Sequence, residues 1–244
     1  MKDCFVLRFN LENMVIPNIR DRIGALSAIF EYERAELEES ALYYESCLME
    51  FVNSINLDLV EKAKKIFSDK KIAFFGDSLT SDRISYANII KKLNIFKKVD
   101  IYAVSGSVSS QVLRTFSQNV KMDDYDIISV FMGTNDSALT DVDFPFITAS
   151  EFKRNLTYAG ALIQDRKAQG IYFKLPIHAE RVFTDGEIIT QDYNDAIESV
   201  GKMQGMKIFD VNGVELRFMD DTVHFLGDTQ KDIAEAFIKM IIKE

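Results

Sequence analysis

The sequence predicts an α/β protein with a parallel sheet, preceded by a helical N-terminal extension. From residue 71 onward, short apolar segments alternate with longer segments of helical periodicity. The apolar segments are continuous, as expected for strands that are buried on both faces of a parallel sheet. Before residue 71, apolar residues recur at roughly helical spacing instead.

Five short apolar segments are predicted as strands: 72–75, 99–104, 127–132, 171–175 and 207–210. The third is the clearest, because it is a nearly unbroken apolar run. Helices are predicted after each strand, near 84–93, 109–120, 150–168, 191–203 and 229–242. We expect Gly170 to end the third of these helices, since glycine is common just past a helix C-terminus.

The N-terminal extension, residues 1–70, carries apolar residues at helical spacing with glutamates between them. This pattern predicts one long amphipathic helix from about residue 23 to 55 and a shorter helix over 57–67, with Asn56 as a cap. The chain is thus divided into 1–70 and 71–244. One interpretation has the extension pack on the α/β domain. The other makes it a dimerisation element, giving a homodimer, or a lid over the site.

Composition limits the class of protein. The 244 residues are 47% apolar and 27% charged, with a net charge of −9. An acidic chain without a clustered basic patch argues against nucleic acid and anionic membranes as partners. The apolar run Phe5–Leu7 is too short for a signal-peptide core. We therefore expect a cytoplasmic protein that does not bind membranes.

The two cysteines, Cys4 and Cys47, make neither a disulfide framework nor a metal site. No metal or other cofactor is predicted. The phosphate-binding glycine motifs of nucleotide-binding proteins are absent from the sequence. The segment Gly76–Ser78 also lacks the Asp-x-Asp pattern of phosphatases that use a nucleophilic aspartate.

One serine, Ser78, lies where the first predicted strand ends, in Gly76-Asp77-Ser78-Leu79. Open α/β sheets carry their chemistry at the carboxyl ends of their strands. A nucleophilic serine needs a base and a third group that orients the base. Of the two histidines, His224 follows Asp221 by three residues, a spacing that brings carboxylate and imidazole to one side of a turn.

Acyl transfer also needs hydrogen-bond donors for the oxyanion. Gly106 lies in a loop of small residues after the second predicted strand, where a backbone N–H can approach a substrate closely. Asn135 follows the third strand and offers a side-chain amide. We expect the carboxylates of Asp77 and Asp136 to fix loops through backbone hydrogen bonds.

The segments Gly76–Leu79, Gly106, Gly133–Asp136 and Asp221–His224 resemble, in this order, the four sequence blocks of the SGNH (GDSL) hydrolase family, the GDSL-like lipases and acylhydrolases. The resemblance extends from Lys71 to the C-terminus. It implies a flavodoxin-like three-layer α/β/α sandwich with a five-stranded parallel sheet.

The same resemblance implies a role for each matching residue. Ser78 would be the nucleophile, His224 the base and Asp221 the orienting carboxylate. The oxyanion hole would be formed by the backbone N–H groups of Ser78 and Gly106 and the side chain of Asn135.

Two positions depart from the family pattern. Many members have proline directly after the catalytic histidine, where this chain has Phe225, and glycine about five residues past it, where this chain has Thr229. We expect these changes to alter the local turn and the pocket wall.

The resulting hypothesis is a serine esterase that cleaves a small acyl ester, such as an acetyl ester of a carbohydrate. The segment 151–156 resembles carbohydrate-acetylesterase-like members of the family. Lysophospholipase or acyl-thioesterase activity is the alternative within the class, and a non-catalytic binding or scaffold protein is the second alternative. Candidate pocket residues are Phe144, Phe146, His178 and Phe183, although for His178 the pattern favours a plain loop role over a place in the pocket.

Overall fold

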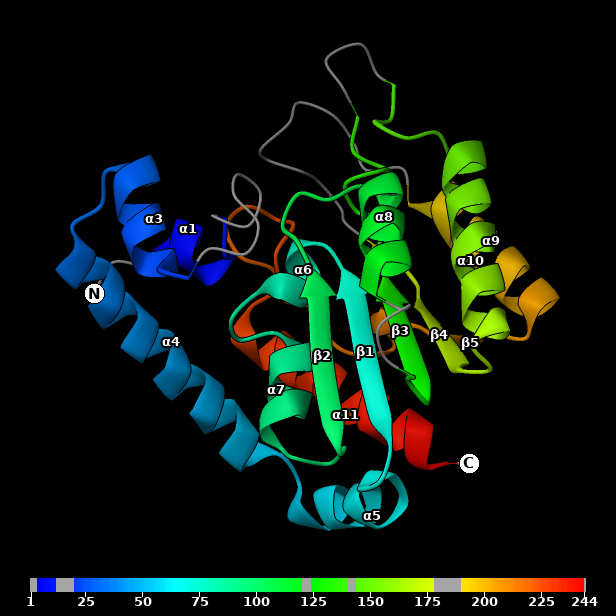
Figure 1. The fold of residues 1–244 in the computed structure, drawn as a ribbon, viewed down its shortest axis with the longest axis horizontal. Coiled ribbons are helices and arrows are strands. Elements are labelled where there is room, and N and C mark those ends of the chain that lie inside the picture. The colour runs from blue at the N-terminus through cyan, green and yellow to red at the C-terminus, as the bar shows by residue number, and fades with distance from the viewer. Residues whose placement is uncertain (1–3, 12–19, 120–123, 140–143, 178–189, 244) are drawn as a thin grey trace.

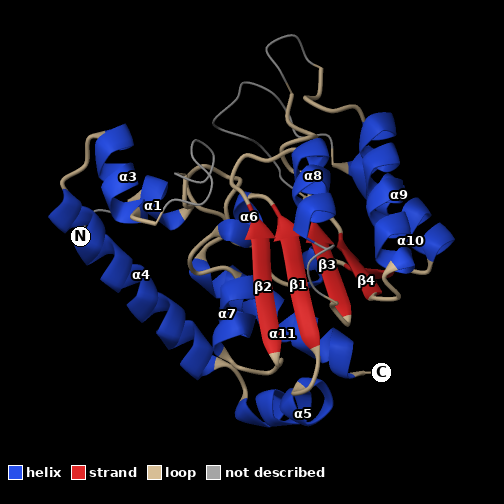
Figure 2. Cartoon of the chain, viewed as in Figure 1, coloured by secondary structure: helices blue, strands red, loops and turns tan. Residues whose placement is uncertain are grey.

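The computed structural model describes residues 4–11, 20–119, 124–139, 144–177 and 190–243. At its centre lies a parallel sheet in the order β2-β1-β3-β4-β5 (Figures 1 and 2). The strands are β1 (Lys71–Gly76), β2 (Lys98–Ala103), β3 (Ile127–Phe131), β4 (Gln169–Phe173) and β5 (Lys207–Phe209). This order is flavodoxin-like, and the predicted sheet is confirmed with strand ends shifted by one or two residues.

Helices cover both faces of the sheet. One layer contains α5 (Leu57–Phe67), α7 (Tyr86–Lys92) and α11 (Gly227–Ile242), and the other contains α8 (Ser109–Asn119), α9 (Ala149–Asp165) and α10 (Gln191–Gln204). Neighbouring residues of β1 show why its sequence is apolar throughout. The ring of Phe74 lies 5.7 Å from Phe237 of α11, whereas the ring of Phe75 lies 4.6 Å from Phe116 of α8. Successive side chains of a strand point to opposite faces, so both must be apolar.

The predicted role of Gly170 is wrong. Helix α9 ends at Asp165, and Gly170 is the second residue of β4. A Cβ atom on Gly170 would lie 2.1 Å from the sulfur of Met206. The glycine therefore makes room for a side chain that packs on the strand, rather than ending the helix.

The N-terminal extension also departs from prediction, because the long helix is broken. It consists of α3 (Arg22–Phe30) and α4 (Arg34–Ser54), with Glu31 between them in the left-handed region at φ 57°. The hydroxyl of Ser27 donates to the carbonyl of Tyr32 at 2.7 Å and stabilises the bend. The predicted cap of α5 is confirmed, since Asn56 Oδ1 accepts from the N–H of Leu59 at 3.1 Å.

The extension packs on the sheet domain, as the first interpretation expected. Helix α4 contacts α7, α11 and the short helix α1 (Phe5–Arg8), which the sequence did not predict. Its buried face includes Leu37, Tyr44 and Leu48. Across the described ranges, none of the helices is long and apolar enough to span a lipid bilayer.

Candidate active site

The turn that carries Ser78 is shaped by the residues on either side of it. Strand β1 ends at Gly76, where a Cβ atom would lie 2.6 Å from the carbonyl oxygen of Phe131. Asp77 then caps the short helix α6 (Ser78–Ser81) by accepting from the N–H of Leu79 at 3.0 Å, which confirms its expected structural role. Ser78 is thus the first residue of a helix at the carboxyl end of a central strand, and 6% of its surface is exposed.

A second loop, residues 217–226, carries the candidate base. Backbone hydrogen bonds join Met219 N–H to the carbonyl of His224 at 2.7 Å and Leu226 N–H to the carbonyl of Arg217 at 2.9 Å. Thr222 adopts the left-handed conformation, with φ 57°. The chain therefore turns back on itself between the two members of the Asp-x-x-His motif.

Asp221 and His224 contact each other directly. The distance from His224 Nδ1 to Asp221 Oδ2 is 2.6 Å, and Asp221 Oδ1 accepts from the backbone N–H groups of Val223 and His224 at 2.8 Å each. Burial acts to raise the pKa of the Asp221 carboxyl, but the hydrogen bonds from His224 and Val223 outweigh it and lower that pKa. An ionised carboxylate only accepts hydrogen bonds, so Nδ1 carries the proton and Nε2 is left as the basic nitrogen.

The candidate oxyanion donors lie on the next two loops. Gly106 has φ 72°, which glycine adopts readily, and it is exposed. Asn135 Nδ2 donates to the carbonyl of Ser107 at 3.0 Å, which ties the loop after β3 to the loop after β2. The first N–H groups of a helix have no acceptor within it, so that of Ser78 is available as well.

Asp136 forms a second link between the same two loops, as predicted. Its carboxylate oxygens accept from the N–H of Ser109, the first residue of α8, at 2.9 and 3.1 Å. Burial raises the pKa of Asp136 to about 6, although hydrogen bonds from Ser109 oppose the rise. This carboxyl is fully buried, so its role is to hold the loop of Asn135 in place.

The structure thus joins Asp221 to His224 and places Ser78, Gly106 and Asn135 after three neighbouring strands at one edge of the sheet. Between the described side chains of Ser78 and His224 there is no hydrogen bond. The described residues also contain no group of three or more His, Cys, Asp or Glu side chains arranged to hold a metal.

The pocket prediction stays untested. Phe144 and Phe146 follow the Asn135 loop with 68% and 58% of their surfaces exposed. His178 and Phe183 lie outside the described residues.

No protein-family model matches the chain, and no curated protein matches it in sequence. Solved structures do match. A lipase/acylhydrolase from Enterococcus faecalis is 19% identical with a TM-score of 0.61, covering 71% of this chain and 96% of that one. A serine-to-alanine catalytic mutant of Axe2, an acetylxylan esterase from Geobacillus stearothermophilus, is 18% identical with a TM-score of 0.60, covering 72% and 96%.

A third match is the psychrotrophic esterase EstA from Pseudoalteromonas sp., in a structure inhibited by monoethylphosphonate. It is 15% identical with a TM-score of 0.55, covering 72% of this chain and 98% of that one. The fold is that of the SGNH hydrolases. The matched chains are covered almost completely, whereas more than a quarter of this chain has no counterpart in them. That unmatched part is about as long as the N-terminal extension.

The two departures from the SGNH sequence pattern both stabilise the loop of His224. Phe225 is buried with its ring 5.5 Å from that of Phe218. The hydroxyl of Thr229 accepts from the N–H of Arg217 at 2.8 Å, which fastens the start of the loop to the first turn of α11. Where many family members have proline, Phe225 thus packs on a neighbouring ring, and where they have glycine, Thr229 accepts a hydrogen bond from the backbone.

Sequence reasoning missed three residues beside this site on the SGNH fold: Arg8, Phe9 and Asp82. Arg8 and Asp82 form a buried ion pair of 3.0 Å, and the ring of Phe9 lies 4.1 Å from the His224 ring. The one available signal was an arginine inside the apolar run Phe5–Phe9, because an arginine in such a run needs a buried partner.

Proposed function

We propose that this protein is a serine esterase of the SGNH type, which cleaves a small acyl ester through an acyl-serine intermediate. The observation that carries the proposal is the 2.6 Å hydrogen bond between His224 Nδ1 and Asp221 Oδ2. A catalytic histidine needs its tautomer and orientation fixed in this way.

In the proposed mechanism, His224 Nε2 takes the proton from Ser78 Oγ as the oxygen attacks the acyl carbon. Asp221 holds the imidazolium that forms. The N–H groups of Ser78, Gly106 and Asn135 stabilise the oxyanion of the tetrahedral intermediate. His224 then gives its proton to the departing alcohol, and a water activated by the same nitrogen releases the acid from the serine.

For the substrate we propose a small acyl group, with acetyl esters of carbohydrates first. The acetylxylan esterase Axe2 supports this choice. The lipase/acylhydrolase of Enterococcus faecalis supports the alternative of a longer acyl chain. Turnover of acetyl, butyryl and long-chain p-nitrophenyl esters, and of acetylated xylooligosaccharides, distinguishes the two.

The nucleophile is tested by Ser78→Ala. Removing one member of a serine triad lowers turnover by several orders of magnitude, so p-nitrophenyl acetate hydrolysis should fall by roughly 10³-fold or more. A fluorophosphonate probe should label the wild type and not the variant. Ser117→Ala, which changes an exposed hydroxyl on α8, is the matched control and should react like the wild type. Absence of labelling in the wild type would favour the scaffold alternative.

A further inference from the structure

Residues 4–11, called here the N-terminal segment, lie against two loops of the candidate site that come later in the chain. Asn10 Nδ2 donates to the carbonyl of Ser81, in the helix that begins with Ser78, at 2.8 Å. The hydroxyl of Ser105, next to Gly106, donates to the carbonyl of Phe9. The segment is therefore bonded to both the nucleophile turn and the first oxyanion loop.

The N-terminal segment also covers His224. The ring of Phe9 lies 4.1 Å from the imidazole centroid at an angle of 38°, and the ring of Phe5 lies 5.5 Å away at 77°. Phe9 is 1% exposed, so this contact is part of the packed interior. The orientation of the imidazole ring thus depends on a segment more than 200 residues away in sequence.

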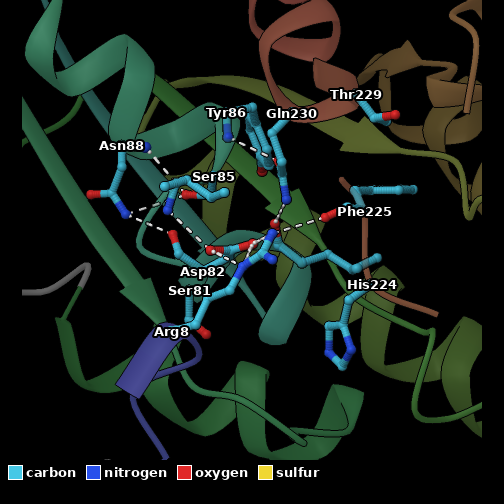
Figure 3. Close-up of polar contacts among 12 residues, drawn as sticks. Arg8, Ser81, Asp82, Ser85, Tyr86, Asn88, His224, Phe225, Thr229 and Gln230 are labelled. Atoms are coloured by element: carbon cyan, nitrogen blue, oxygen red, sulfur yellow. Dashed lines mark hydrogen bonds and ion pairs between the residues drawn. The ribbon is translucent and has the colours of Figure 1, made fainter. Parts of the chain in front are cut away.

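Arg8 connects the two sides of the site. Its Nη2 donates to Asp82 Oδ2 and to the carbonyl of Phe225, the residue after His224, at 3.0 Å each, and its Nε lies 3.2 Å from the same carboxylate oxygen (Figure 3). The backbone N–H of Asp82 in turn donates to the carbonyl of Ser78 at 3.1 Å. One guanidinium therefore lies between the nucleophile turn and the loop of the base.

The chemistry of this link favours a positioning role over a stabilising one. Arg8 is 5% exposed and Asp82 fully buried, and a buried ion pair is often no more stable than apolar residues of the same volume. Burial raises the pKa of the Asp82 carboxyl, and the charge of Arg8 opposes that rise. The planar guanidinium of Arg8 makes several hydrogen bonds at once, and it therefore fixes the positions of Asp82 and Phe225 relative to each other.

We propose that Arg8 is a positioning residue: it holds the loop of His224 at a fixed place relative to the turn of Ser78. The N-terminal segment is then part of the catalytic machinery rather than an appendage to the SGNH fold. This inference rests on the proposed esterase function, since it assigns Arg8 a role in aligning that base with that nucleophile.

The test is the double variant Arg8→Met/Asp82→Asn. It removes both buried charges together, and Asn keeps a side-chain oxygen that can accept from the N–H of Ile84, now at 3.0 Å. Misalignment of catalytic groups by a fraction of an ångström to 1 Å can cost up to about 100-fold. We expect kcat for p-nitrophenyl acetate to fall about 10- to 100-fold with KM within about twofold of the wild type.

Two further variants make the result decisive. Arg8→Lys keeps the charge but lacks the planar fork of the guanidinium. Its kcat should lie between those of the double variant and the wild type, and a cooperative thermal melt should show that it is folded. Arg34→Met, the same kind of substitution at an exposed ion pair on α4, should keep the wild-type kcat. A wild-type kcat in the folded double variant, or in Arg8→Lys should the double variant not fold, overturns the positioning role.

Failure of the proposed function would look different. In that case the wild type itself would show no hydrolysis and no Ser78-dependent labelling by the fluorophosphonate probe. That result would remove the esterase assignment, and the role of Arg8 with it, before any Arg8 variant was compared.

Discussion

Asn135 uses one of its two amide protons inside the protein and keeps the other. The bond to the carbonyl of Ser107, at 3.0 Å, fixes the plane of the side chain before any substrate binds. A terminal amide has two N–H donors, so one remains for an oxyanion. Donors that are held in place in advance need no reorganisation during the reaction, which is why they contribute strongly to catalysis.

We therefore expect Asn135→Ala to lower kcat by about 100-fold, the usual cost of one oxyanion donor, with little loss of stability. Steady-state hydrolysis of p-nitrophenyl acetate and a thermal melt measure the two effects. Asn119→Ala, at the end of α8, removes an amide remote from the proposed site and should retain full activity. A wild-type rate in Asn135→Ala would remove this residue from the oxyanion hole.

At the scale of elements, Asp136 joins the loop after β3 to the start of α8. Its pKa of about 6 in the folded protein lies above the value near 4 of an unfolded chain. Between these values the folded state binds more protons than the unfolded state, so stability is lost as pH rises from about 4 to 6. At neutral pH the ionised, buried carboxylate of Asp136 therefore lowers the free energy of unfolding. The same carboxylate holds the loop of Asn135 in place.

Asp136→Asn should abolish that loss. Relative to the wild type, the free energy of unfolding of the variant should rise by at most about 3 kcal/mol between pH 4 and pH 7, from a shift of about two pKa units. Urea unfolding at several pH values measures the difference. Asp69→Asn, an exposed change, should show no such trend. Parallel pH curves for the wild type and Asp136→Asn would contradict the raised pKa.

At the scale of the whole molecule, the N-terminal extension and the SGNH fold share one core. Helix α4 contacts α7 and α11, and its residue Leu48 is buried with them in a continuous apolar cluster. Two parts that share a core unfold together, because neither keeps its buried surface without the other. The homodimer expected through these helices stays a prediction, and light scattering of the purified chain tests it.

Leu48→Ala should lower the free energy of unfolding by about 2–5 kcal/mol and leave a single transition. Far-UV circular dichroism and tyrosine fluorescence, from the nine tyrosines, should give coincident urea curves. Leu42→Ala, on the exposed face of α4, should change stability by no more than about 0.5 kcal/mol. Two separated transitions would show instead that the extension folds independently.

Local patterns predicted much of this protein because their causes are local. A strand that is buried on both faces must be apolar throughout, so β1 and β3 were recognisable as short apolar runs. Asp221 and His224 meet within a single turn, so their pairing followed from a spacing of three residues. The break at Glu31 was missed because apolar periodicity continues across the bend.

The sequence by itself determined the five parallel strands and the pairing of Asp221 with His224, since a buried apolar run and a spacing of three residues are local features. Only the tertiary structure decided that Arg8 reaches Asp82, 74 residues further on, and that Phe9 covers the ring of His224. No periodicity encodes such contacts, because they form only when burial brings distant segments together and leaves a charge that needs a partner.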